Sequence, residues 1–223
     1  MISQEVLQQG ALLLVDKPHG WTSFDVVKKI RTSFNIKKVG HAGTLDPLAT
    51  GLLIICTGKM TKQIDNYQAL EKEYVGTMVL GKTTPSIDLE TDVDSTSDTS
   101  HLTEQEIVEH TIPFCGWIDQ VPPVFSAIKL KGKRVYKMAR RGEAVKLQSR
   151  KVHIGEFKIT RCEIPDVDFK VSCSKGTYIR SLVRDLGKSL GVGAHLTALQ
   201  RTAIGEYRLE HAFTIENLIK QIK

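Results

Sequence analysis

The chain has 223 residues, of which 41% are hydrophobic and 25% are charged, as in an ordinary globular protein that needs no staples for its core. Its 31 Lys and Arg residues outnumber its 25 Asp and Glu residues, which gives a net charge of +6. The four cysteines form no C-x-x-C pair, so we expect no metal site and no disulfide framework. The first ten residues are polar and the longest apolar run is Leu52 to Cys56, so we expect no export signal and no membrane span. We therefore predict a cytoplasmic protein.

Periodicity and turn residues predict the secondary structure. In chain order we expect a strand at 11–15, a helix at 23–34, mostly loop at 39–51, strands at 52–56 and 73–80, a long exposed acidic excursion at 83–100, a helix at 104–110, strands at 126–130, 152–160 and 168–173, a helix at 178–190, a strand at 205–209 and a helix at 216–222. The strands outnumber the helices and do not alternate with them regularly. This pattern predicts an α+β fold, with a mixed, mostly antiparallel central sheet flanked by helices, in one domain of residues 1–223.

Charge is distributed unevenly along the chain. Between Lys129 and Lys151 there are ten Lys or Arg residues and one acid, whereas between Thr83 and His110 there are eight acids and no Lys or Arg. A basic segment of this density suits a phosphate backbone, where each neutralised phosphate releases counterions. The alternative is a solvated charged face, and charge alone does not separate the two.

Residues 40–51 carry the most specific chemical signal. Asp46, followed by Pro47, lies in a loop with three glycines that leads into the apolar run 52–56. Such a loop allows close approach of a ligand while the strand fixes the carboxylate, which favours catalysis. The alternative is that Asp46 caps the turn before Pro47.

Two glycine-rich segments fail as nucleotide motifs. Residues 51–59 have six residues between their glycines where a phosphate loop has four, and 191–196 lack the third glycine of a dinucleotide fingerprint. We therefore expect no cofactor.

Six segments together identify a family. GHAGTLDPLATGLL, residues 40–53, resembles the active-site motif of the TruB family, the bacterial tRNA pseudouridine-55 synthases. Further segments resemble that family's other motifs in the same order, namely 16–23 (DKPHGWTS), 72–74 (KEY), 120–132 (QVPPVFSAIKLKG), 176–182 (GTYIRSL) and 195–199 (HLTAL). The resemblance implies the pseudouridine synthase fold with a thumb-like, RNA-binding insertion at about 112–150.

The resemblance also implies an activity and its catalytic residues. Such an enzyme isomerises the uridine at tRNA position 55, in the T loop, by flipping the base, detaching it from its ribose and rejoining it through carbon 5. Asp46 would be the nucleophile, Arg180 its ionic partner and Tyr74 the active-site aromatic residue. From the pattern alone, Arg180 could be a surface charge and Tyr74 a core aromatic.

Other residues are implied to hold the RNA. The substrate-binding candidates are His41, Tyr178, Leu199 and Lys17, where His41 fills the space of the flipped base and Leu199 packs against it. Without the resemblance, His41 would be an ordinary loop residue and Leu199 a helical core residue. The candidates for phosphate contacts in the basic segment are Lys129, Lys131, Lys133, Arg134, Arg140 and Arg141. The expected partner is the tRNA T stem-loop, with no guide RNA and no membrane, and the protein is expected to be a monomer.

The chain departs from the family pattern in three places. Residues 84–88 (TPSID) keep the first Thr and the last Asp of T-D-T-x-D but lose the middle Asp, and 199–201 read L-Q-R where L-R-R is usual. We also expect no separate C-terminal RNA-binding domain of the kind that many members of that family have. The alternative functions are a non-catalytic RNA-binding protein or tRNA folding chaperone, a glycosidic hydrolase, and a guide-dependent synthase.

Overall fold

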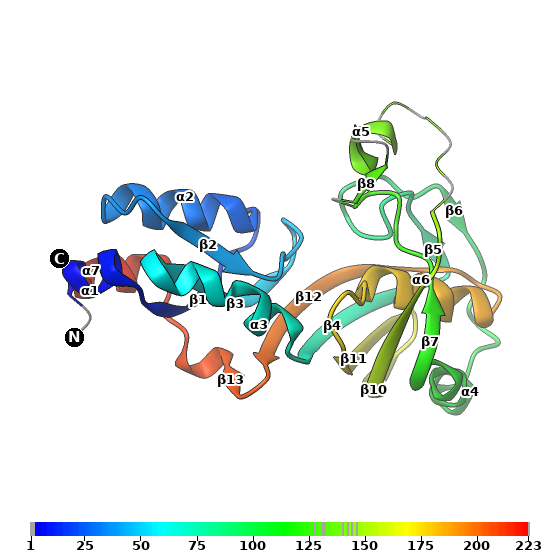
Figure 1. Ribbon diagram of the computed structural model, residues 1–223. Helices are drawn as coiled ribbons and strands as arrows, with labels where there is room; N and C mark the ends of the chain where they lie inside the picture. Colours follow the sequence, from blue (N-terminus) through cyan, green and yellow to red (C-terminus); the bar gives the residue numbers. More distant parts are fainter. Residues whose placement is uncertain are drawn as a thin grey trace. The chain divides into compact units, whose positions relative to one another are not determined.

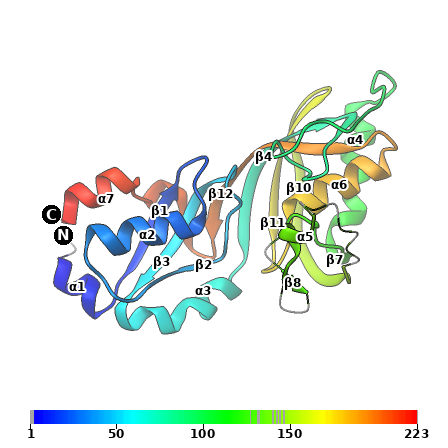
Figure 2. The same ribbon diagram turned by 90° about the horizontal axis from the view of Figure 1, so that it is seen from above.

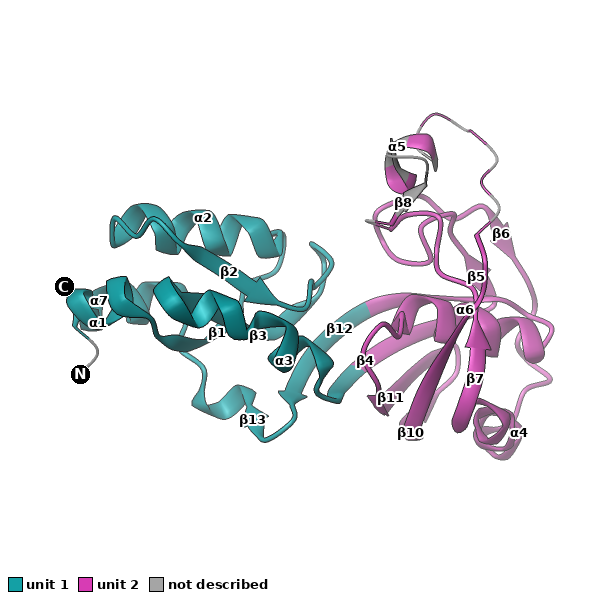
Figure 3. Ribbon diagram, viewed as in Figure 1, with its two compact units in different colours: residues 1–75, 198–223 teal, residues 76–197 magenta. Residues whose placement is uncertain are grey.

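The computed structural model describes residues 3–126, 128–130, 133–139, 141, 143, 145 and 147–222. The chain divides into two compact units, residues 1–75 with 198–223 (unit 1) and residues 76–197 (unit 2), coloured separately in Figure 3. Unit 1 contains α1 (Gln4–Gln9), β1 (Leu12–Lys17), α2 (Ser23–Ser33), β2 (Val39–Ala42), β3 (Thr50–Thr57), the 3₁₀ helix η1 (Gly58–Gln63), α3 (Ile64–Ala69), β13 (Tyr207–Arg208), η3 (Leu209–His211) and α7 (Ile215–Ile222).

Unit 2 holds the middle of the chain (Figure 1). It contains β5 (Lys82–Thr83), β6 (Ser95–Thr96), α4 (Glu104–Thr111), η2 (Ile112–Phe114), β7 (Gly116–Gln120), β8 (Lys129–Leu130), β9 (Lys133–Arg134), α5 (Val135–Ala139), β10 (Arg150–Glu163), β11 (Asp166–Cys173) and α6 (Ile179–Ser189). Two further strands, β4 (Lys72–Leu80) and β12 (Ala194–Ile204), contribute residues to both units. No helix in the described part of the chain is long and apolar enough to cross a bilayer.

The strands confirm the predicted α+β fold. Among the described residues, the main sheet has the order β1-β3-β12-β4-β11-β10-β7, with β2 also paired to β3 and β13 to β12. The pairs β1/β3, β2/β3, β10/β11, β7/β10 and β12/β13 are antiparallel, whereas β3 and β12 are parallel where Thr50 faces Gln200. The sheet is therefore mixed and mostly antiparallel.

Strand β3 divides the core of unit 1 into two layers. Leu53 and Ile55 point to one face, against the buried side chains of α2 and α7, whereas Leu52, Ile54 and Cys56 point to the other face, toward α3 and β13. This alternation is the period of a strand that is covered on both faces. The apolar run is consequently buried throughout, and it fixes the loop that precedes it.

Helix α2 begins where the sequence predicts. Thr22 accepts a hydrogen bond from the backbone of Asp25, and the Asp25 carboxylate accepts one from the backbone of Thr22, which together form a capping box. Val26, Val27 and Ile30 recur at helical spacing and are buried.

In unit 2, helix α6 lies alongside the strands β10 and β11 (Figures 1 and 2). Leu182, Val183 and Leu186 are buried at helical spacing, as expected for the helix predicted at 178–190. Phe169 on β11 contacts Phe157 on β10 edge to face, with ring centroids 5.8 Å apart.

Several predicted elements are wrong. Residues 39–42 form β2 within the expected loop, and the expected strand 126–130 shortens to β8 at 129–130. The expected strand 205–209 shortens to β13, whereas the long strand β12 was missed, and so were α1, α3 and β7. In 194–204 the polar residues interrupt the alternation of apolar ones, so the pattern gave no strand signal.

The acidic stretch is only partly exposed. Residues 89–100 are largely at the surface, but Thr84, Ser86, Ile87 and Asp88 are buried. The prediction of one exposed excursion over 83–100 is therefore wrong for its first residues, whose polar groups bind Arg180.

Candidate active site

The loop that carries Asp46 is held on both sides by the residues of the segment 17–23. The Ser23 hydroxyl accepts a hydrogen bond from the Leu45 amide at 2.9 Å, and the Gly20 amide donates to the Pro47 carbonyl at 2.9 Å. The Lys17 ammonium also donates to the Pro47 carbonyl, at 3.2 Å. The two sequence motifs thus meet in one hydrogen-bonded structure that fixes the backbone around Asp46.

Asp46 is partly exposed in a loop that buried residues anchor at both ends. Leu45 and Ala49 are each 3% exposed and anchor the loop in the core of unit 1. The turn after Asp46 is closed through the main chain, because the Ala49 amide donates to the Asp46 carbonyl at 3.1 Å. A carboxylate on so restrained a backbone can be directed at one atom of a ligand.

Lys17 is fully buried beside this loop. Its ammonium donates to the carbonyls of Pro18, Trp21 and Pro47, so three acceptors satisfy its three protons. Burial lowers the pKa of Lys17 to about 8, while the negative charge of Asp46 opposes the shift. Lys17 therefore holds the backbone of the Asp46 loop from its buried side and places a positive charge near Asp46.

Arg201 on β12 is a site residue that the sequence analysis missed. It is 1% exposed, and its guanidinium donates to the Leu52 carbonyl at 2.7 Å and to the Gly43 carbonyl at 3.1 Å. It thereby joins β12 to the loop that carries Asp46. In the sequence Arg201 stands between Gln200 and Thr202, and the available signal is its place as the last residue of the L-Q-R segment that departs from the family's L-R-R.

Tyr74 on β4 is buried next to Arg201. Its ring centroid is 6.0 Å from the guanidinium carbon, within the range of a cation–π contact, and its side chain is 8% exposed. Tyr74, Asp46 and Lys17 all belong to unit 1.

His41 lies on β2 opposite Ile55 and is partly buried. Within the described residues its Nδ1 is buried and has no hydrogen-bond partner. Burial, and secondly the positive charge of Arg201, lower the pKa of His41, which favours the neutral imidazole. A neutral aromatic ring is suited to stacking against a base.

Arg180 is buried in the first turn of α6, so the surface-charge alternative is wrong. It is 4% exposed and donates to the carbonyls of Ser86 at 2.9 Å and Phe125 at 2.8 Å. Its Nε lies 3.6 Å from a carboxylate oxygen of Asp88. Asp88 is the last Asp of the family's T-D-T-x-D pattern, which this chain keeps although it lacks the middle Asp.

The residue before Asp88 has an unusual backbone. Ile87 has a φ of +63°, a conformation that is rare for a β-branched residue and costs free energy. Its amide donates to Thr84 and its carbonyl accepts from Leu196, so hydrogen bonds on both sides hold it in place. The strained turn directs the Ser86 carbonyl and the Asp88 carboxylate to Arg180.

Tyr178 precedes α6 and is fixed by the side chain of Gln120. The Gln120 amide donates to the Tyr178 carbonyl at 3.1 Å and accepts from the Tyr178 amide at 2.8 Å. The Arg150 guanidinium lies 4.5 Å from the centre of the Tyr178 ring, a cation–π contact.

The predicted site residues fall in two groups. Unit 1 holds Lys17, His41, Asp46 and Tyr74 together with Leu199, which is half-buried on β12 and not on a helix as expected. Unit 2 holds Tyr178 and Arg180. The pairing of Asp46 with Arg180 joins residues of different units and stays a prediction.

The predicted phosphate contacts lie in the basic segment. Arg141 is exposed, and its guanidinium is 3.9 Å from the carboxylate of Glu143. Lys131 and Arg140 lie outside the described residues, and so do the side chains of Lys129, Lys133 and Arg134. Their role stays a prediction, as does the insertion itself.

Among the residues that the structure describes, no three His, Cys, Asp or Glu side chains are grouped as metal ligands would be.

Comparison with known proteins gives consistent results. The profile of the TruB family pseudouridylate synthase N-terminal domain matches residues 31–179, and that of the tRNA pseudouridylate synthase B C-terminal domain matches residues 180–223. The tRNA pseudouridine synthase B of Flavobacterium johnsoniae is 53% identical over 222 residues, which cover 96% of each chain. That of Phocaeicola vulgatus is 51% identical over 94% of this chain and 92% of its own.

A solved structure is also similar. A chain from the structure of an H/ACA ribonucleoprotein bound to a substrate RNA containing 2′-deoxyuridine superimposes with a TM-score of 0.73 and is 30% identical. The match covers 97% of this chain and 54% of that one, so this chain spans about half the length of its structural relative.

Proposed function

The chain belongs to the TruB family of pseudouridylate synthases and is a tRNA pseudouridine synthase, and we propose that it forms pseudouridine 55 in the T loop with Asp46 as its nucleophile. The observation that carries this assignment is the fixed loop of Asp46. Hydrogen bonds with Ser23, Gly20, Lys17 and Arg201 hold its backbone on both sides, and Asp46 remains partly exposed.

The reaction is an isomerisation that requires no oxidant or reductant. The bond between ribose C1′ and uracil N1 breaks, a bond between C1′ and C5 forms, C5 loses a proton and N1 gains one. A carboxylate nucleophile splits this exchange into two easier steps through a covalent intermediate. Asp46 attacks the sugar or the base, and both routes require its ionised form.

The surrounding residues have distinct roles in this proposal. Arg180, already held by Asp88 and two carbonyls, pairs with Asp46 and keeps it ionised. Tyr74 stacks on the flipped uracil and assists removal of the C5 proton. The neutral imidazole of His41 takes the place of the base in the T loop.

The remaining candidates bind the substrate or hold the loop that does. Tyr178, fixed by Gln120, and Leu199 line the uracil, and Lys17 acts through the Pro47 carbonyl to hold the Asp46 loop. The basic segment contacts the T-stem phosphates. Since all these groups belong to one chain, we propose that it acts on tRNA as a monomer without a guide RNA. The tRNA substrate favours a cytoplasmic location.

The test uses purified protein, an unmodified tRNA transcript tritiated at uridine C5, and an Asp46→Asn variant. We expect the wild type to release tritium from the T-loop uridine, and the variant to release none while still binding tRNA. Equal release by both proteins would refute Asp46 as the nucleophile. Binding without release by the wild type would favour an RNA-folding chaperone, and free uracil would indicate a hydrolase.

A further inference from the structure

Unit 1 has a hollow along the exposed side of α2. It has a volume of about 390 Å³ and is lined by Gly20, Trp21, Asp25, Lys28, Lys29 and Thr32. The last four residues follow a spacing of three and four along α2, so they belong to one face of the helix. This face is opposite to the buried side chains Val26, Val27 and Ile30.

The hollow is basic. Lys28 and Lys29 are exposed, and within the described residues neither forms an ion pair. Asp25, whose carboxylate accepts hydrogen bonds from the Thr22 amide and hydroxyl as part of the helix cap, is the one acid in the lining and offsets one of its two lysines. From residue 23 to residue 38 the chain has five Lys or Arg residues and one acid, so the whole segment attracts anions.

One end of the hollow is connected directly to the Asp46 loop. The Gly20 amide donates to the Pro47 carbonyl, and the Lys17 ammonium donates both to that carbonyl and to the Trp21 carbonyl. Lys28 and Lys29 are five and six residues after Ser23, which corresponds to about 8 to 9 Å along the helix axis. The two lysines are therefore within about two helical turns of the end of α2 that contacts the Asp46 loop through Ser23.

Phe24 adds an aromatic surface to the same helix. Its side chain is 60% exposed, and it precedes Lys28 by four residues, so the two side chains are neighbours on the helix surface. Exposed aromatic residues beside cations are typical of surfaces that bind single-stranded nucleic acid.

We propose that the α2 hollow, with Lys28 and Lys29, binds backbone phosphates of the substrate RNA next to the target uridine. This inference rests on the proposed function, because it assigns a second contact for the same RNA. It places phosphate contacts in unit 1, whereas the basic segment 129–151 belongs to unit 2.

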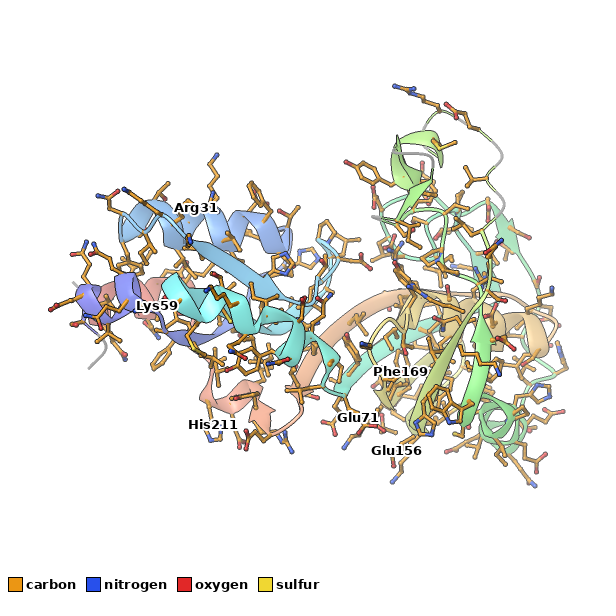
Figure 4. All side chains as sticks on the ribbon, in the orientation of Figure 1. Arg31, Lys59, Glu71, Glu156, Phe169 and His211 are labelled. Atoms are coloured by element: carbon orange, nitrogen blue, oxygen red, sulfur yellow. The ribbon has the colours of Figure 1, made fainter. Side chains whose placement is uncertain are left out.

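The experiment compares a Lys28→Gln/Lys29→Gln variant with a matched Lys59→Gln/Lys62→Gln control. The control removes two exposed lysines from η1 of the same unit. Figure 4 labels Lys59 on η1 and also Arg31 on α2, the helix that carries Lys28 and Lys29. The dissociation constant for an unmodified tRNA transcript is measured in the Asp46→Asn background, so that no turnover occurs, between 50 and 200 mM salt. Lys and Gln have similar helix propensities, so α2 stays folded.

We expect Lys28 and Lys29 to make the plot of log binding constant against log salt concentration steeper by about 1.4 to 1.8. Over this fourfold rise in salt, the parent protein should then lose about 7- to 12-fold more affinity than the Lys28→Gln/Lys29→Gln variant. The η1 control and a charge-preserving Lys28→Arg/Lys29→Arg variant should keep the parent slope.

Equal slopes for the parent and the Lys28→Gln/Lys29→Gln variant would overturn the proposal, as would an equal loss in the η1 control. The proposed function fails separately, if the wild-type protein releases no tritium from the T-loop uridine.

Discussion

Lys17 and Arg201, two buried cations of unit 1, donate hydrogen bonds to the backbone on either side of Asp46. Arg201 binds the Gly43 carbonyl before it and Lys17 binds the Pro47 carbonyl after it. Burying two like charges is costly, and Arg201 contributes to the lowered pKa of Lys17. The negative charge of Asp46 offsets part of this cost for Lys17, so the carboxylate that we propose as the nucleophile also stabilises one of the cations that hold its loop.

Replacement of Arg201 tests this support. In an Arg201→Met variant the carbonyls of Leu52 and Gly43 lose a charged donor, and we expect the free energy of unfolding to fall by about 3 kcal/mol. We also expect kcat to fall more than KM rises, because the loop loses its position but the RNA surface remains. Urea unfolding and single-turnover kinetics measure both effects. The exposed Arg208→Met control should change stability by less than about 0.5 kcal/mol, and an equal loss there would contradict the prediction.

The lowered pKa of Lys17 predicts a dependence of stability on pH. Its pKa is 10.5 in an unfolded chain and about 8 in the folded protein, so between these values the unfolded chain binds more protons at this residue. The contribution of Lys17 to the free energy of unfolding therefore rises with pH from about 8 to 10.5. The difference between wild type and Lys17→Met in urea unfolding should rise over this window.

A Lys17→Arg variant is the second comparison for this prediction, because its guanidinium stays charged throughout the window. Wild type should gain stability relative to this variant as well. A difference that stays flat, or falls, from pH 8 to 10.5 would show that Lys17 keeps an ordinary pKa.

Residue chemistry was predictable only where a motif carried it. The resemblance pointed to Arg180, and the structure shows it buried against Ser86, Phe125 and Asp88. Arg201 is equally buried, but its acceptors are main-chain carbonyls of residues about 150 positions away. Such a role depends on which strands are neighbours, and residue types alone do not reveal it.

At the scale of elements, Gln120 shows how one strand positions a helix of the site. Tyr178 provides no side-chain cap for α6, and Gln120 at the end of β7 binds both main-chain groups of Tyr178 instead. Gln120 is 1% exposed, so these bonds are shielded from water. The position of Arg180, two residues later, is consequently fixed by β7.

Elements with a complete local signal were predicted well. A cap residue and apolar spacing predicted a helix at 23–34, and α2 spans 23–33. The apolar spacing in 178–190 predicted a helix there, and α6 spans 179–189. The strands β7 and β12 were missed because each buries a polar side chain, Gln120 or Arg201, that breaks the apolar pattern. Polar residues that bind buried backbone therefore concealed two strands that hold parts of the site.

At the scale of the whole molecule, cations and acids are separated along the chain. The basic segment 129–151 and the segment 23–38 together hold fifteen of the 31 Lys and Arg residues, with one acid each. The acids concentrate at 83–110. A charge distribution of this kind attracts RNA to particular surfaces and speeds its association.

The last prediction concerns the basic segment. A Lys131→Gln/Lys133→Gln/Arg140→Gln variant should raise KM for tRNA and lower its salt dependence, by about 0.7 to 0.9 in the slope for each phosphate that the variant no longer binds. The single-turnover rate at saturating enzyme should stay near that of wild type, since these residues do not carry the chemistry. If the segment and the α2 hollow bind separate phosphates, combining these changes with Lys28→Gln/Lys29→Gln should lower the slope by the sum of the two effects. A combined variant with no lower slope than the triple variant would show that the two surfaces do not bind tRNA at the same time.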